Sequence, residues 1–200
     1  MIDVGANRGQ YATGLRHAGW RGPIVSFEPL PDLREALAQA ASADPGWVIA
    51  PPLALGDRDA VAVLERSAES DMSSLLPRTA LLERISPSSA VVERLEVPLR
   101  RLDGLAIVTA SPWRRMLVKL DVQGAEAAVL DGMAGLWERI AALQLELSLV
   151  PLYRGETPWR AMVDRLAAEG FTLGLVIPGY YEHKLGRHLQ FDGLFVRNLL

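Results

Sequence analysis

The chain has 200 residues, of which 50% are hydrophobic and 22% are charged, a composition that predicts a folded domain with its own core. A net charge of −3 gives no reason to expect nucleic acid or an anionic membrane as the main partner. The sequence lacks an apolar run of about 18 residues and a signal-peptide pattern, so we expect a cytoplasmic protein without a membrane span. It also lacks cysteine, which excludes disulfides, thiol nucleophiles and cysteine-bound zinc.

The first part of the chain alternates short apolar runs with segments of helical period. The predicted elements are strand 2–4, helix 10–18, strand 23–28, helix 31–41 and strand 47–55. Pro31 suits the first turn of its helix, where its missing N–H has no partner to lose. Pro51 and Pro52 interrupt strand 47–55, so we expect that strand at a sheet edge or with a bulge.

The middle of the chain is dominated by two strands with alternating patterns and a long polar connection between them. The predicted elements are strand 60–67, a serine-rich loop 68–90, strand 91–99, strand 116–122 and helix 124–133. Strands 60–67 and 91–99 fit together as hairpin partners. We therefore predict one domain over residues 1–200, with a hairpin and loop insertion at about 57–99.

The last part of the chain completes a pattern of strands that alternate with helices. The predicted elements are strand 140–150, helix 157–169, strand 171–178 and strand 189–198. The connection between the last two strands has no helical pattern, which favours an antiparallel pair. The alternation predicts an α/β, Rossmann-like fold with a mostly parallel sheet and helices on both faces. Ligands of such sheets bind at the carboxyl ends of the strands, which puts the turns after residues 4, 28, 55, 121 and 148 on one rim.

A glycine-rich turn and an acid lie at that rim. Gly5 and Gly9 surround Asn7 directly after the first strand, where backbone N–H groups can approach a ligand closely. Asp3 precedes the turn and could accept hydrogen bonds from an ammonium group or from the loop. Glu28 ends the second strand, where a carboxylate suits the two hydroxyls of a ribose. A plain structural turn and a solvated acid are the alternatives for each feature alone, but together they predict a ribose-containing ligand.

Two other functions remain possible on these residues. An NAD-dependent oxidoreductase is disfavoured, because the spacing of Gly5 and Gly9 does not meet the three-glycine dinucleotide pattern. A non-catalytic module that binds a cofactor or a partner within a biosynthetic assembly is the other alternative.

A series of short motifs resembles the FkbM family of S-adenosylmethionine-dependent methyltransferases over essentially the whole chain. The motifs are DVGANRGQYA (3–12), FEP (27–29), ALGD (54–57), SSLL (73–76), KLDVQGAE (119–126) and FDGLFVR (191–197). The resemblance implies the class I methyltransferase fold, with seven strands of which the last is antiparallel. It also implies O-methylation of a hydroxyl on a small metabolite, sugar or natural-product intermediate, with N-methyl transfer left open.

The resemblance implies a set of residues that bind S-adenosylmethionine and its product, S-adenosylhomocysteine. These are Asp3, Gly5, Asn7, Gly9, Gln10 and Tyr11 for the methionine part, Glu28 for the ribose, Pro29, Leu30, Leu55, Gly56 and Asp57 for the adenine, Ser73 and Ser74 from a covering loop, and Asp121 beside the methyl group.

Methyl transfer to a hydroxyl needs a collinear acceptor and a group that takes the hydroxyl proton. Asp121 is the first candidate for this base, and Glu146 and His183 are the alternatives; His183 could equally be a solvated loop residue. Gln123 stands where relatives often carry Glu, so a two-carboxylate metal site is less expected, and a divalent metal is possible but not predicted. Residues 177–184 (IPGYYEHK) are either a wall of the acceptor pocket or a simple loop.

The expected partner is a small molecule with a hydroxyl, and a homo-oligomer is possible. Relatives usually carry helices before the first strand that cover the acceptor pocket. We therefore expect this pocket to be open or to be closed by a partner chain.

Overall fold

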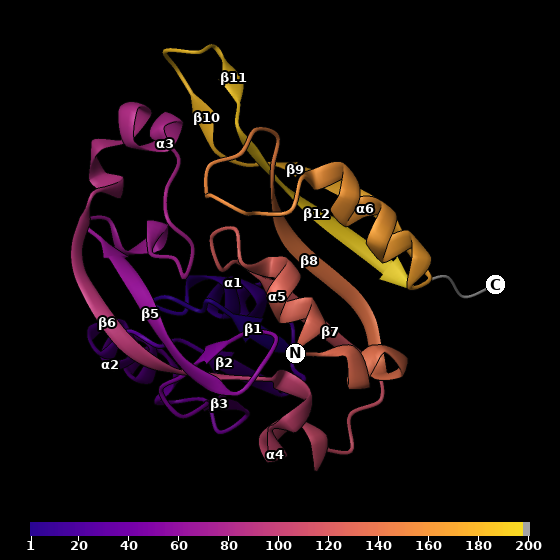
Figure 1. Ribbon diagram of the computed structural model, residues 1–200. Coiled ribbons are helices and arrows are strands. Elements are labelled where there is room, and N and C mark those ends of the chain that lie inside the picture. The colour runs from indigo at the N-terminus through magenta and orange to yellow at the C-terminus, as the bar shows by residue number, and fades with distance from the viewer. Residues whose placement is uncertain (198–200) are drawn as a thin grey trace.

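A seven-stranded sheet forms the centre of the protein in the computed structural model, which describes residues 1–197 (Figure 1). The strands, in the order in which they pair, are β3 (Trp47–Ile49), β2 (Ile24–Phe27), β1 (Ile2–Val4), β7 (Met116–Leu120), β8 (Ile140–Ser148), β12 (Gln190–Arg197) and β9 (Phe171–Pro178). The first five are parallel, and β12 is antiparallel to both β8 and β9. This confirms the predicted fold class and the antiparallel last strand. Asn198, the final residue of the predicted strand 189–198, lies outside the described residues.

Helices cover both faces of this sheet. These are α1 (Gln10–His17), α2 (Pro31–Ala41), α4 (Ala106–Thr109), α5 (Glu126–Asp131) and α6 (Trp159–Ala168). A further helix, α3 (Ala80–Ile85), lies outside these faces, and 3-10 turns occur at Ser70–Met72, Pro87–Ser89, Leu102–Gly104 and Ala134–Arg139. Successive strand residues point to opposite faces. Ile2 and Val4 pack into the core formed with α4, α5 and α6, whereas Met1 packs with α1 and α2 on the other face. The four helices predicted from sequence correspond to α1, α2, α5 and α6; α3 and α4 were not predicted.

A second, three-stranded sheet lies beside the central one. It consists of β4 (Ala54–Leu55), β6 (Val91–Arg100) and β5 (Ala60–Ser67), with β5 and β6 antiparallel. The prediction of one strand over 47–55 is wrong, because its two halves belong to different sheets. Pro51 and Pro52 have no N–H and cannot continue the ladder of β3. β3 does lie at the edge of its sheet, as the prolines predict.

The segment between β5 and β6 was predicted as a loop, but it contains α3. Thr79 caps this helix by accepting a hydrogen bond from the backbone N–H of Leu82 (3.4 Å). α3 then buries Leu82 against Leu152, Tyr153 and Leu189. The connection between β9 and β12 likewise contains a short hairpin, β10 (Tyr181–Glu182) and β11 (Arg187–His188). No helix in residues 1–197 is long and apolar enough to cross a membrane.

One lysine is buried inside the central sheet. Lys119 on β7 lies opposite Asp3 on β1, and its Nζ is 3.6 Å from Asp3 Oδ1 and 3.2 Å from Asp121 Oδ2. The same ammonium donates to the backbone oxygen of Gly5 (3.0 Å), and Ser26 donates to Asp3 Oδ2 (3.2 Å). Burial alone would lower the pKa of Lys119, but the carboxylates of Asp121 and Asp3 raise it above its ordinary value. Lys119 is therefore the charged partner of a fully buried aspartate.

We predict that Lys119→Met lowers the free energy of unfolding by about 3–5 kcal/mol, because Asp3 would be left as a buried charge without a counter-ion. Urea denaturation measures this loss. Lys184→Met is the matched control, since Lys184 is exposed on the β10–β11 hairpin and its change should stay within about 0.5 kcal/mol. Equal stability of the wild type and Lys119→Met would show that the buried pair is not needed.

Candidate functional site

The glycine-rich turn after β1 packs against the backbone of two neighbouring strands. Gly5, Asn7 and Gly9 all have positive φ angles, of 72°, 49° and 85°. A Cβ at Gly5 would lie 1.9 Å from the carbonyl oxygen of Asp121, so only glycine fits at this position. The backbone N–H of Gly5 also donates to the carbonyl oxygen of Phe27 at the end of β2 (3.1 Å). The turn, the end of β2 and the end of β7 thus converge on one rim.

Glu28 follows β2 and is held by two backbone donors. The N–H of Asn7 donates to its Oε2 and the N–H of Leu30 to its Oε1, each at 2.9 Å. The residue is only 5% exposed, and burial raises the pKa of its carboxyl while these two hydrogen bonds oppose the rise. Each carboxylate oxygen has more than one lone pair, so both can still accept a hydrogen bond from a ligand.

A cavity lies along this rim, and we call it the first cavity. Leucines form much of its apolar wall, and Glu28 and Asp121 contribute carboxylates to its lining. The residues predicted to bind a cofactor that line it are Gly5, Asn7, Gln10, Glu28, Pro29, Leu30, Leu55, Ser73, Ser74 and Asp121. Its mixture of apolar walls with a few polar groups is typical of small-molecule sites.

The other residues of the predicted cofactor set do not line the first cavity. Asp3 is fully buried in the sheet, and Gly9 packs against Trp47. Tyr11 does not contribute to the lining, and its hydroxyl donates to Gln144 Oε1 (2.6 Å). Gly56 and Asp57 directly follow β4 of the three-stranded sheet, and the carboxylate of Asp57 pairs with the exposed Arg58 (2.9 Å). These residues support or flank the cavity rather than form its surface.

A second cavity adjoins the first. The residues that line both are Gln10, Asp71, Asp121 and Gln123. Glu146 on β8, Gln190 on β12 and Tyr153 extend the lining of the second cavity away from the first. The two cavities thus adjoin at these four residues, and Asp121 and Gln123 are among them.

Gln123 connects the two carboxyl groups at this meeting point. Its backbone has a positive φ of 56°, and its side-chain nitrogen donates to Asp121 Oδ1 (2.9 Å) and to Glu146 Oε2 (2.8 Å). The hydroxyl of Tyr153 donates to Gln123 Oε1 (2.8 Å), which fixes the orientation of the amide. Gln190 donates a further hydrogen bond to Glu146 Oε2 (2.8 Å). Burial and the charge of Asp121 raise the pKa of Glu146 well above its usual range, so this carboxyl favours its protonated form.

The third predicted catalytic candidate lies elsewhere. His183 is exposed on the β10–β11 hairpin, with its ring centroid 5.1 Å from that of Tyr181, and it lines neither cavity. Tyr180, from the same predicted wall segment, does line the second cavity and donates its hydroxyl to Glu182 (2.7 Å). Within residues 1–197, no cluster of three or more His, Asp or Glu side chains is arranged to hold a metal ion.

Sequence reasoning missed part of this network. Lys119 carried a signal, because a charged residue interrupts an otherwise apolar strand. Gln123 was noted only as a replacement for Glu, and nothing in the local pattern around Tyr153 or Gln190 pointed to a site.

Comparisons of the sequence and of the structure with known proteins both find methyltransferases. The model of the methyltransferase FkbM domain matches residues 3–173. The structure is similar to a methyltransferase FkbM from Methylobacillus flagellatus KT (TM-score 0.54, 14% identity), over 96% of this chain and 42% of that one. It is also similar to a putative S-adenosylmethionine-dependent methyltransferase from Listeria monocytogenes (TM-score 0.53, 8% identity), over 98% and 90% of the two chains. No curated protein matches in sequence.

The structural similarities establish the fold, and the family model adds the sequence evidence. The matched range includes the glycine-rich turn, Glu28, Asp121 and Glu146. It thus places the glycine-rich turn in a methyltransferase domain rather than in an NAD-dependent oxidoreductase. The chain belongs to the FkbM methyltransferase family.

Proposed function

We propose that this protein transfers a methyl group from S-adenosylmethionine to a hydroxyl of a small, uncharged acceptor. The observation that carries the proposal is the meeting of two cavities at Asp121 and Gln123. Transfer between two bound molecules needs two spaces that open to each other at the reacting atoms. The first cavity is suited to the cofactor and the second to the acceptor.

The residues of the first cavity fit S-adenosylmethionine. Glu28 would accept the ribose hydroxyls, since its carboxylate is already oriented by Asn7 and Leu30. Pro29 and Leu30 would flank the adenine, and the turn around Gly5 and Asn7 would hold the methionine part. When bound, the cofactor supplies an electrophilic methyl group on a sulfonium centre. The negative charges of Asp121 and Glu28 suit that cation.

The second cavity indicates an acceptor without anionic groups. Asp71, Asp121 and Glu146 contribute three carboxyl groups to its lining, and no lysine or arginine is among the described residues that line it. A phosphate or carboxylate would lie among acidic groups there without a cation to pair with. Amide and phenol groups remain to hydrogen-bond hydroxyls. This charge distribution supports a small polar acceptor and argues against nucleic acid as the partner.

Asp121 is the better placed of the two carboxyls to accept the hydroxyl proton. It lies where the two cavities adjoin, and its Oδ2 is 3.2 Å from the Lys119 ammonium, which holds the carboxylate in place. Glu146 lines the second cavity alone, and burial raises the pKa of its carboxyl. In this arrangement Glu146, held by Gln123 and Gln190, orients the acceptor while Asp121 takes its proton.

We predict that Glu28→Ala weakens binding of S-adenosylhomocysteine by about 1–3 kcal/mol, because charged hydrogen bonds to the ribose are lost. Isothermal titration calorimetry measures the change. Glu35→Ala removes an exposed acid from α2 and should leave the affinity unaltered. An affinity of Glu28→Ala equal to that of the wild type would remove Glu28 from the ribose role.

We predict that Asp121→Asn lowers turnover by about 10²-fold or more, the contribution expected of a general base, while cofactor affinity is largely kept. Turnover is measured as the formation of S-adenosylhomocysteine from S-adenosylmethionine in the presence of uncharged hydroxylated compounds. Turnover by Asp121→Asn at the wild-type rate would exclude this residue as the base. Cofactor binding without turnover by the wild type on any such acceptor would favour the non-catalytic alternative.

A further inference from the structure

One short segment forms a wall of both cavities. Residues 70–78, which we call the strap, connect the end of β5 to α3. Ser70, Asp71, Ser73 and Ser74 line the first cavity, and Asp71 and Met72 line the second. The position of the strap therefore affects the space for the cofactor and the space for the acceptor together.

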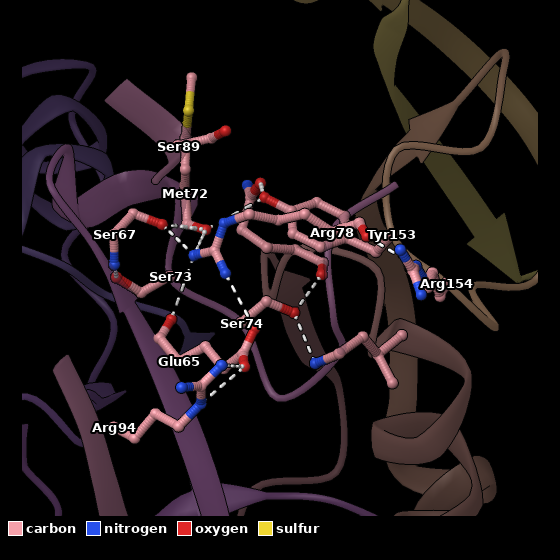
Figure 2. Close-up of polar contacts among 12 residues, drawn as sticks. Glu65, Ser67, Met72, Ser73, Ser74, Arg78, Ser89, Arg94, Tyr153 and Arg154 are labelled. Atoms are coloured by element: carbon pink, nitrogen blue, oxygen red, sulfur yellow. Dashed lines mark hydrogen bonds and ion pairs between the residues drawn. The ribbon is translucent and has the colours of Figure 1, made fainter. Parts of the chain in front are cut away.

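The side chain of Arg78 holds the strap to the second sheet. Figure 2 shows its guanidinium pointing back toward β5 and the turn at Met72. Nη1 donates to Glu65 Oε2 (3.0 Å), and Nη2 donates to Ser67 Oγ and to the carbonyl oxygens of Glu65 (3.3 Å) and Met72 (3.4 Å). The residue is only 3% exposed and lines neither cavity. A buried cation with oxygen atoms from three residues around it holds those residues in one arrangement.

The backbone of Arg78 fixes the other end of the strap. Arg78 pairs with Tyr153 as an antiparallel bridge, and Arg154 Nε donates to the carbonyl oxygen of Arg78 (3.0 Å). The Tyr153 hydroxyl lies 3.2 Å from the carbonyl oxygen of Met72 and 2.8 Å from Gln123 Oε1. The strap is thus anchored between the second sheet and the wall of the second cavity.

Ser74 links the strap directly to the junction of the cavities. Its backbone forms a two-way bridge with Glu65, with N–O distances of 2.9 and 3.1 Å. Its hydroxyl donates to the carbonyl oxygen of Gln123 (2.6 Å). Gln123 in turn bridges Asp121 and Glu146, so a shift of the strap would disturb the amide that spaces the two carboxyls.

From these contacts we infer that Arg78 is a positioning residue, which fixes the strap and so sets the affinity of the protein for the cofactor without touching it. The inference rests on the proposed use of the first cavity for S-adenosylmethionine. A strap that is held before binding loses less conformational freedom when a ligand arrives, and this raises affinity. Without the Arg78 guanidinium, the strap would become ordered only when the ligand binds, and this ordering would lower the affinity.

The test compares three variants by calorimetry with S-adenosylhomocysteine, at a temperature where each is fully folded by circular dichroism. Arg78→Met should raise Kd about tenfold, because the strap loses its cation. Arg78→Lys keeps the charge but cannot span all three partners, so its Kd should lie between. Arg94→Met is the matched control, since Arg94 pairs with the same Glu65 carboxylate (2.8 Å) from an exposed position, and its Kd should equal that of the wild type.

Amide hydrogen exchange separates positioning from general destabilisation. In Arg78→Met, the amides of residues 70–76 should exchange faster while those of β1 and β7 keep their protection. Unchanged affinity in Arg78→Met, or a loss of protection throughout the central sheet, would overturn the inference. If Arg78→Met does not fold, Arg78→Lys provides the test. A Kd of Arg78→Lys equal to that of the wild type would likewise overturn the inference. Failure of the wild type to bind S-adenosylhomocysteine would instead refute the proposed function.

Discussion

The buried ammonium of Lys119 is the interaction on which the site depends. It contacts Asp3 within the sheet, the carbonyl oxygen of Gly5 in the glycine-rich turn and Asp121 at the end of β7. Asp3 lies within β1, Gly5 lies in the turn after β1, and Asp121 directly follows β7. Because a buried carboxylate without a counter-ion is costly, the ion pairs hold the strand ends in one arrangement.

The two cavities are built from different parts of the fold. The central sheet provides Glu28 and the glycine-rich turn for the first cavity, and Glu146 and Gln190 for the second. The segment between β5 and β6 then closes both, through the strap and through α3. The central strands alone leave this side without a wall, so the second sheet and the strap complete the site. Arg78 lies outside both cavities but contacts the segment that lines them.

The fold and the residues that line the rim could be predicted because their signals are local. Strand and helix periods, the glycines at 5 and 9, and an acid directly after a strand are all visible within a few residues of sequence. The errors have local causes too. The predicted strand 47–55 is two strands in the structure, because two prolines end the ladder of β3. Helix α3 was missed because its six residues are too few for a clear helical period and its cap is a single threonine.

The sequence by itself determined the class of fold, the turn around Gly5 and the carboxylates Glu28, Asp121 and Glu146, because residue type and position relative to a strand end are enough to place them. Only the tertiary structure decided which groups surround them. Tyr153 and Gln190 reach Gln123 and Glu146 across separations of 30 and 44 residues. Lys119 contacts Gly5 across a separation of 114 residues. Contacts of that length depend on how strands pair and loops pack, which no local pattern records.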